Sequence, residues 1–201
     1  MTRNDTLFKT IIFFICLLPL VLLITDFFLQ KLGANPVETI IRDTGLWSLR
    51  FLIMTLCITP LRKLASWQWG MKIRRMLGLY AFFYGCLHLI AYLWFDHLFD
   101  LTAVWRDILE RPFITLGFIT FLCMLPLAIT STNSMMRRLG KRWQQLHRLI
   151  YLIAITSIIH FWWMADSKGK LTTPIIYATI VAVLLLMRIF FLKKSFSGKR
   201  P

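Results

Sequence analysis

Six apolar runs, each close to the length that crosses a lipid bilayer, follow one another along this 201-residue chain. They cover residues 8–29, 45–64, 76–95, 112–130, 144–164 and 173–192. A hydrocarbon core of about 30 Å needs roughly 20 apolar residues in a helix. Backbone inside lipid must satisfy its own hydrogen bonds, and runs without two-residue alternation do so as helices. The pattern predicts an all-α integral membrane protein, a bundle of six transmembrane helices.

Composition agrees with a lipid environment and with a single domain over residues 1–201. Hydrophobic residues make up 58% of the chain and charged residues only 16%, whereas soluble domains carry about 25% charged residues. The net charge of +15 could indicate nucleic-acid binding, but the basic residues lie at the ends of apolar runs and not on one soluble face. We therefore predict membrane lipid, and no nucleic acid, around this chain. The four cysteines lie inside apolar runs without CxxC spacing, which argues against a disulfide framework or a zinc site.

Charge placement predicts the orientation in the membrane. Lys and Arg concentrate in residues 62–75, 137–148 and 188–200, whereas most Asp and Glu lie in residues 26–43 and 96–110. Because basic residues gather on the cytoplasmic side, both termini are expected in the cytoplasm of a bacterial inner (cell) membrane protein. The long connection 96–111 then faces outward, where Trp105 can lie in the interface plane or dock a partner. His97, in the same stretch, is expected to be a solvated loop residue.

Three histidines, His88, His147 and His160, fall inside apolar runs. Ionisable residues inside the membrane are costly and are functional candidates by default. A neutral imidazole is a good axial ligand for haem iron, and two of them from different helices can clamp a haem within a bundle. The alternative reading is a histidine that only makes hydrogen bonds between helices.

Depth selects one pair of these histidines. If Arg74 and Arg75 mark the inner boundary of their span, His88 lies about 21 Å further along the helix axis. Counted from Arg142, His160 lies about 27 Å into its span. We therefore predict that His88 and His160 are the axial ligands of one haem.

His147 is a separate candidate. It lies only about 8 Å beyond Arg142 and about 20 Å along the axis from His160, a separation that suits an inner and an outer cofactor. The two residues point about 140° apart around an ideal helix, so they share an interior face only if the helix is tilted or locally irregular. An inner haem is one reading, and contact with lipid, a flavin phosphate or quinone is the other.

Several strings in the sequence resemble the MsrQ family, also called YedZ, of haem-binding membrane subunits of bacterial periplasmic methionine-sulfoxide reductase systems. The strings are residues 32–36 (LGANP), 74–78 (RRMLG) leading to His88, 110–112 (ERP), 129–133 (ITSTN), 139–147 (LGKRWQQLH) and 159–160 (IH). The resemblance implies a ferric-reductase-like six-helix fold with b-type haem, one or two per chain, and FMN. It also implies haem-linked roles for His88, His147 and His160.

The resemblance further implies an electron-transfer subunit, not a stand-alone catalyst. Electrons would come from the quinone pool or a cytosolic flavin reductase and reach a periplasmic molybdenum-containing partner, MsrP, that repairs oxidised proteins. The wider reductase family places two histidines fourteen apart on its third helix, but Arg74 stands at the earlier position here. Arg74, with Arg75 and Arg142, either neutralises a haem propionate or flavin phosphate or only anchors the cytoplasmic side.

Three other functions are compatible with the residues alone. They are a ferric reductase acting on external iron, a haem-free transporter that uses the histidines as a proton relay, and a haem-free scaffold for a periplasmic enzyme. Transporters are often built from two symmetric halves, and no internal repeat is visible in the sequence.

Overall fold

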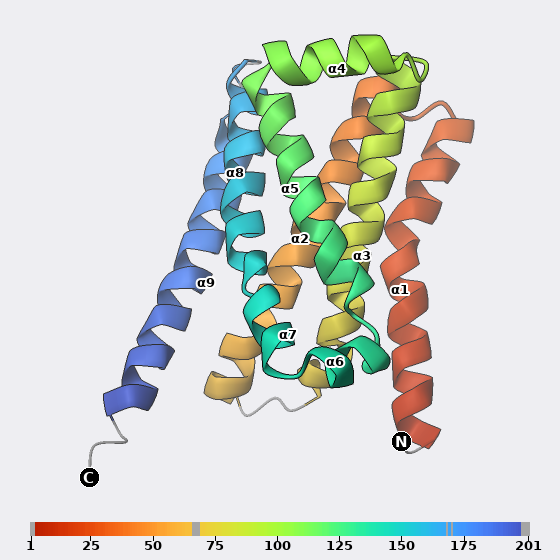
Figure 1. The fold of residues 1–201 in the computed structure, drawn as a ribbon. Coiled ribbons are helices and arrows are strands. Elements are labelled where there is room, and N and C mark those ends of the chain that lie inside the picture. Colours follow the sequence, from red (N-terminus) through yellow and green to blue (C-terminus); the bar gives the residue numbers. More distant parts are fainter. Residues whose placement is uncertain (1–2, 66–68, 168, 170, 198–201) are drawn as a thin grey trace.

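The computed structural model describes residues 3–65, 69–167, 169 and 171–197 (Figure 1). Within these residues the chain is helical and contains no strand. The elements are α1 (Arg3–Phe28), α2 (Pro36–Ala65), α3 (Gly70–Ala91), the π-helical η1 (Tyr92–Asp96), α4 (Leu101–Glu110), α5 (Pro112–Ile129), α6 (Asn133–Leu139), α7 (Lys141–Leu146), α8 (Leu149–Asp166) and α9 (Thr172–Ser197).

Six helical stretches of the described chain are long and apolar enough to cross a membrane. They are Asp5–Phe28, Pro36–Ala65, Gly70–Asp96, Pro112–Ile129, Lys141–Asp166 and Thr172–Phe191. Each contains or closely matches one apolar run, so the prediction of a six-helix membrane bundle is confirmed. The protein is a multi-pass membrane protein.

The two ends of the bundle differ in charge. Figure 1 shows α4 lying across one end, with the start of α2 nearby, and this end carries Glu38, Asp96 and Asp107. At the other end lie α6 and α7, the start of α1 and the end of α9, together with the basic residues of 137–142. We call these the acidic end and the basic end. The described parts of the basic clusters recognised in the sequence therefore lie at one end of the bundle, which is the arrangement that the predicted orientation requires.

Two of the predicted spans differ from the helices observed, one in where it begins and the other in being divided. Helix α2 begins nine residues before the run at 45–64, because Asn35 caps it by accepting the Glu38 N–H at 3.2 Å and Pro36 suits the first helical position. The predicted span 144–164 is divided into α7 and α8 at His147 and Arg148. There the Arg148 N–H bonds the Gln145 carbonyl at 3.1 Å, three residues back, which is the tighter 3₁₀ pattern.

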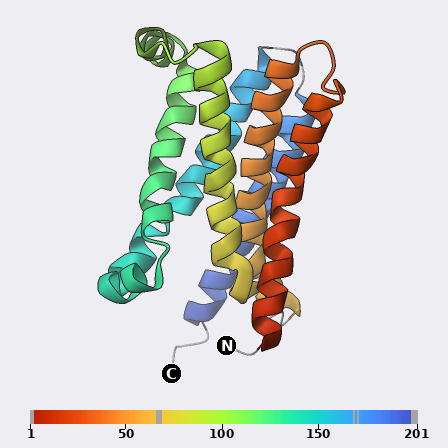
Figure 2. The same cartoon turned by 90° about the vertical axis from the view of Figure 1, so that its right-hand side faces the viewer.

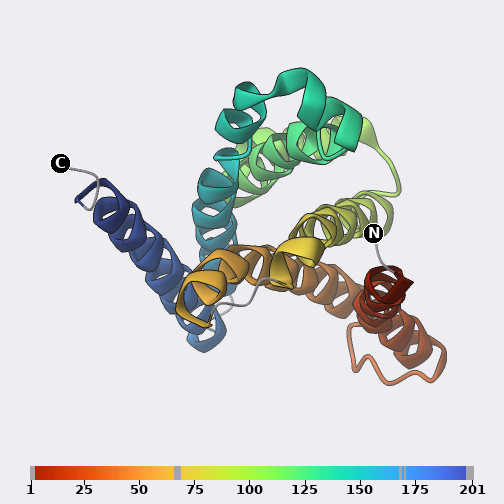
Figure 3. The same ribbon diagram turned by 90° about the horizontal axis from the view of Figure 1, so that it is seen from below.

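The core of the first half is built around aromatic residues of α2 and α3. Phe51 stacks on Tyr80 and Tyr84, with ring centres 5.5 and 5.3 Å apart, and all three side chains are buried. The hydroxyls of the two tyrosines reach the backbone of α1, which flanks the bundle in Figures 2 and 3. Tyr80 donates to the Phe13 carbonyl at 2.8 Å. These contacts fix α1 against α3.

Tyr84 makes the stronger attachment, because its hydroxyl donates to the Cys16 carbonyl at 3.0 Å and accepts the Leu20 N–H at 3.1 Å. We expect Tyr84→Phe to lower the free energy of unfolding by about 1 kcal/mol, the size of a hydrogen bond between membrane helices. Tyr80→Phe, which removes a single bond, should have a smaller effect. Denaturation of both variants in mixed micelles measures the difference, and an unchanged Tyr84→Phe would contradict this account.

Helix α4 is fastened to the acidic end by one carboxylate. Asp107 accepts hydrogen bonds from Tyr92 at 3.2 Å and pairs with His97 at 3.0 Å and with Arg111 at 3.3 Å. The expectation that His97 is a solvated loop residue is therefore wrong, since its side chain is only 13% exposed. The sequence did not reveal this pairing because the two residues meet only after the chain turns back through α4.

Helix α4 also carries an exposed apolar stripe made by Leu101, Trp105 and Leu109. Figure 2 shows α4 end-on, extending past the tops of α3 and α5. The two predicted roles of this segment, lying in the membrane interface and docking a partner, both stay open.

Candidate functional site

The structure brings the rings of His88 and His160 next to each other. His88 lies in α3 and His160 in α8, two helices that run in the same direction. Their ring centres are 6.2 Å apart and the ring planes are inclined by 77°. Both side chains are partly buried. The two histidines, which the sequence predicts to lie at matching depth, are thus close to each other in space.

Each of these imidazoles is fixed by a backbone carbonyl. The Nδ1 of His88 is 2.8 Å from the Ile41 oxygen, and the Nδ1 of His160 is 2.6 Å from the Phe113 oxygen. A carbonyl can only accept a hydrogen bond, so both Nδ1 atoms must carry the proton. In the neutral tautomer this leaves the Nε2 lone pair free, which is how histidines that bind metals are usually oriented.

The spacing of the two rings fits a six-coordinate iron. A bond between a metal and an imidazole nitrogen is about 2 Å long, so ring centres 6.2 Å apart leave room for one metal ion between the two rings. Among the described residues, no group of three His, Cys, Asp or Glu side chains can hold a bare metal ion. A haem needs only two axial ligands from the protein, because its own nitrogens fill the other four positions. The pair therefore fits haem.

His147 lies where α7 meets α8 and has one free ring nitrogen. Its ring stacks on Trp143, with centres 3.9 Å apart and planes inclined by 26°. Its Nδ1 donates to the Trp143 carbonyl at 3.0 Å. The Nε2 is buried and makes no hydrogen bond of ordinary geometry, although the Leu127 backbone lies near this imidazole. A buried, unpaired lone pair is costly, so this nitrogen is suited to a metal or to a ligand that donates a hydrogen bond.

An arginine from another helix lies near this histidine, and a second arginine lies near the first. Arg74 of α3 is within electrostatic range of His147 and of Arg188 in α9. The Arg188 guanidinium lies 4.9 Å from the centre of the Tyr151 ring, and its Nη1 is buried without a hydrogen-bond partner. Neither arginine forms an ion pair with a carboxylate in the described part of the chain. Both arginines are partly buried, and partly buried positive charge without a counter-charge favours an anionic ligand.

Known proteins with similar sequences identify the family of this chain. Residues 44–158 match the model of the ferric reductase like transmembrane component. A protein of Herminiimonas arsenicoxydans, named protein-methionine-sulfoxide reductase heme-binding subunit MsrQ, is 56% identical over 187 residues, which cover 92% of this chain and 86% of that protein. This chain belongs to the MsrQ family.

Two further MsrQ relatives support the same assignment across nearly the whole chain. The MsrQ subunit of Azospira oryzae is 48% identical over 93% of this chain and 80% of its own length. That of Rhodospirillum rubrum is 44% identical over 98% of this chain and 95% of its own length. No solved structure matches this chain. The resemblance drawn from short strings is therefore confirmed, and the fold is that of a ferric-reductase-like membrane protein.

The other basic residues predicted for the MsrQ cofactor site lie differently. Arg75 is turned toward α6, where its guanidinium donates to the Asn133 amide oxygen and lies 3.6 Å from the Met136 sulfur. Arg142 is exposed on α7. Arg188, by contrast, was not singled out from the sequence, because one arginine near the end of an apolar run looks like an anchor at the membrane boundary. Only its buried, unpaired nitrogen distinguishes it.

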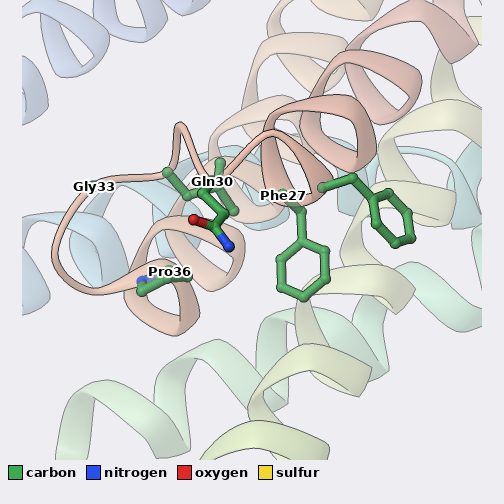
Figure 4. A pocket seen from close by; sticks show the side chains of 6 residues that line it. Phe27, Gln30, Gly33 and Pro36 are labelled. Carbon is green, nitrogen blue, oxygen red and sulfur yellow. The ribbon is translucent and has the colours of Figure 1, made fainter.

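A pocket of about 500 Å³ lies elsewhere, at the turn between α1 and α2 (Figure 4). It is lined by Phe27, Phe28, Gln30, Leu32, Gly33 and Pro36. None of these side chains is titratable, so the pocket offers no ligand for iron and no charge for an anion. The candidate cofactor ligands therefore lie at the histidines and not at this pocket.

Proposed function

We propose that this protein carries electrons across the membrane through b-type haem held by His88 and His160. The observation that carries the proposal is the opposed pair of imidazoles, 6.2 Å apart, with each Nδ1 committed to a carbonyl. The heme-binding subunits named among the relatives support it. The related family of ferric reductase like transmembrane components supports a redox role.

The protein's part in this chemistry is to hold and tune the cofactor. Haem, when bound, supplies a one-electron couple whose potential depends on the axial ligands, burial and nearby charge. Hydrogen bonds from Nδ1 to the Ile41 and Phe113 carbonyls orient the rings and raise the basicity of Nε2. Two protein ligands leave no axial position for a substrate. We infer an electron-transfer subunit, and not an enzyme that acts alone on external iron.

We propose that electrons enter at an inner cluster formed by His147, Arg74 and Arg188. His147 offers a free Nε2, and Arg74 and Arg188 offer positive charge. This set suits either a second haem b, with His147 on the iron and the arginines on a propionate, or FMN, with the arginines on its phosphate. The exposed Arg75 and Arg142 belong to the outer rim of the same basic surface. The donor is the quinone pool or a cytosolic flavin reductase.

The acceptor is proposed to meet the acidic end. With the basic end in the cytoplasm of a bacterial inner membrane, electrons leave near His88 and His160 on the periplasmic side. The name of the relatives points to a methionine-sulfoxide reductase as the partner. We infer a periplasmic molybdenum-containing MsrP-type enzyme that repairs oxidised proteins.

Two measurements on the full chain test this function. Protein purified from haem-replete cells should show a Soret band and an α band that shifts with dithionite, and extraction should yield haem b. Vesicles that contain the protein and enclose ferricyanide should oxidise reduced flavin added outside, and vesicles without the protein should not. A correctly folded but colourless protein, or haem-loaded vesicles without electron transfer, would refute the proposal.

A further inference from the structure

One three-part arrangement occurs twice in the bundle. In the hairpin of α2 and α3, the Ile41 carbonyl accepts from His88, and Gly45 follows Ile41 by four residues. In the pair formed by α5 and α8, the Phe113 carbonyl accepts from His160, 47 residues later as in the first case. Here too a glycine, Gly117, stands four residues after the accepting residue.

The two glycines face the two histidine rings. A Cβ atom at Gly45 would lie 2.9 Å from Nδ1 and 3.0 Å from Cε1 of His88. A Cβ atom at Gly117 would lie 2.7 Å from Cε1, 2.8 Å from Nδ1 and 3.2 Å from Nε2 of His160. Contacts this short are not tolerated between real atoms. Any side chain at either position must therefore push the imidazole away.

The geometry of a helix explains why the glycine stands four residues after the carbonyl. The Cβ of each helical residue leans toward the N-terminus, beside the residue four positions earlier. A side chain at that position would block sideways access to the carbonyl, whose second lone pair is otherwise free. Glycine opens this access, and the Nδ1–H of histidine uses it.

We propose that Gly45 and Gly117 are positioning residues that seat the two imidazoles, and that the pairs α2–α3 and α5–α8 are two copies of one unit that delivers a histidine. The inference rests on the proposed function, because the seated rings are the proposed haem ligands. It goes further in assigning the ligand geometry to two glycines. The second unit lies 72 residues after the first, and its carbonyl, glycine and histidine each stand 72 residues after their counterparts.

Gly78 and Gly85, the other glycines within the bundle helices whose surroundings are described, do not share this feature. A Cβ at Gly78 of α3 would meet only the Thr55 methyl at 3.8 Å, an ordinary contact. Small residues also allow helices to approach closely in membranes, and that explanation would bring backbone atoms near Gly45 and Gly117. The nearest atoms at both positions are instead those of a histidine ring.

The test compares Gly117→Ala and Gly45→Ala with the control Gly78→Ala in the full-length protein. We expect the first two variants to lose haem affinity by about tenfold or more, the effect of losing a group that orients a metal ligand, with Gly117→Ala affected more. The electron paramagnetic resonance signal of any haem retained should also shift, because the ring planes turn. Gly78→Ala should keep the haem and its spectrum.

A second measurement separates this inference from the proposed function. In the haem-free protein with ¹⁵N-labelled histidine, Gly45→Ala should abolish the signature of a protonated, hydrogen-bonded Nδ1 at His88, with helix content unchanged. Wild-type protein that never binds haem would refute the proposed function. The nitrogen spectra would still test whether the glycines position the histidine rings. Wild-type-like haem binding and nitrogen spectra in both alanine variants would overturn the inference.

Discussion

His160→Ala is expected to yield a folded protein that has lost the haem held by His88 and His160. The substitution removes one of two iron ligands, and the loss should exceed the 10- to 100-fold reduction in affinity that follows when only a supporting partner of a metal ligand is removed. His88→Ala should behave alike, because the two rings face each other in equivalent settings. Haem per polypeptide, measured after extraction, gives the result.

The chain offers a matched control for this experiment. His97 is also partly shielded and hydrogen-bonded, but it pairs with Asp107 near α4 and not with another histidine. His97→Ala should therefore retain haem. Full haem content in both His88→Ala and His160→Ala would show that neither residue is an axial ligand.

Arg188→Gln is expected to slow the entry of electrons by about tenfold or more while the haem between His88 and His160 stays bound. A tenfold change corresponds to about 1.4 kcal/mol, which is modest for removing a charge-assisted contact to an anionic group. Arg74→Gln should act in the same direction, because the two arginines lie within electrostatic range of each other. The rate of reduction of the haem by reduced flavin in micelles measures the effect.

Arg148→Gln is the control for the inner cluster. Arg148 adjoins His147 in sequence, carries the same charge and is exposed. Its replacement should leave the reduction rate near the wild-type value. Equal slowing in Arg148→Gln and Arg188→Gln would mean that only the overall charge of the basic end matters, and would contradict a specific site.

The six spans and the proximity of His88 and His160 could be anticipated from the sequence because both depend on regular geometry. A helix rises by a constant amount per residue, so a count from the basic boundary gives the depth of each histidine. Lateral position has no such simple measure. The sequence therefore could not tell that Arg188 of α9 meets Arg74 of α3, or that its Nη1 has no partner.

Local irregularities were the other gap. The break at His147 lies in a continuous stretch of good helix formers, and the tightened turn there became visible only in three dimensions. The repeated unit of carbonyl, glycine and histidine could not be recognised in the sequence. It needs only a glycine and a histidine at fixed spacing, and its carbonyls can belong to residues of any type. The apolar residues between them are interchangeable in lipid, so no repeat in the letters marks it.

The central claim is that one haem iron is bound between His88 and His160, and electron paramagnetic resonance of the oxidised wild-type protein tests it most directly. Two imidazole ligands with planes inclined by 77° should give a low-spin signal of the highly anisotropic type that nearly perpendicular axial rings produce. The signal should account for one haem per chain and disappear in His88→Ala and His160→Ala. A wild-type spectrum without this highly anisotropic signal, or the same signal persisting in the absence of these histidines, would contradict the account.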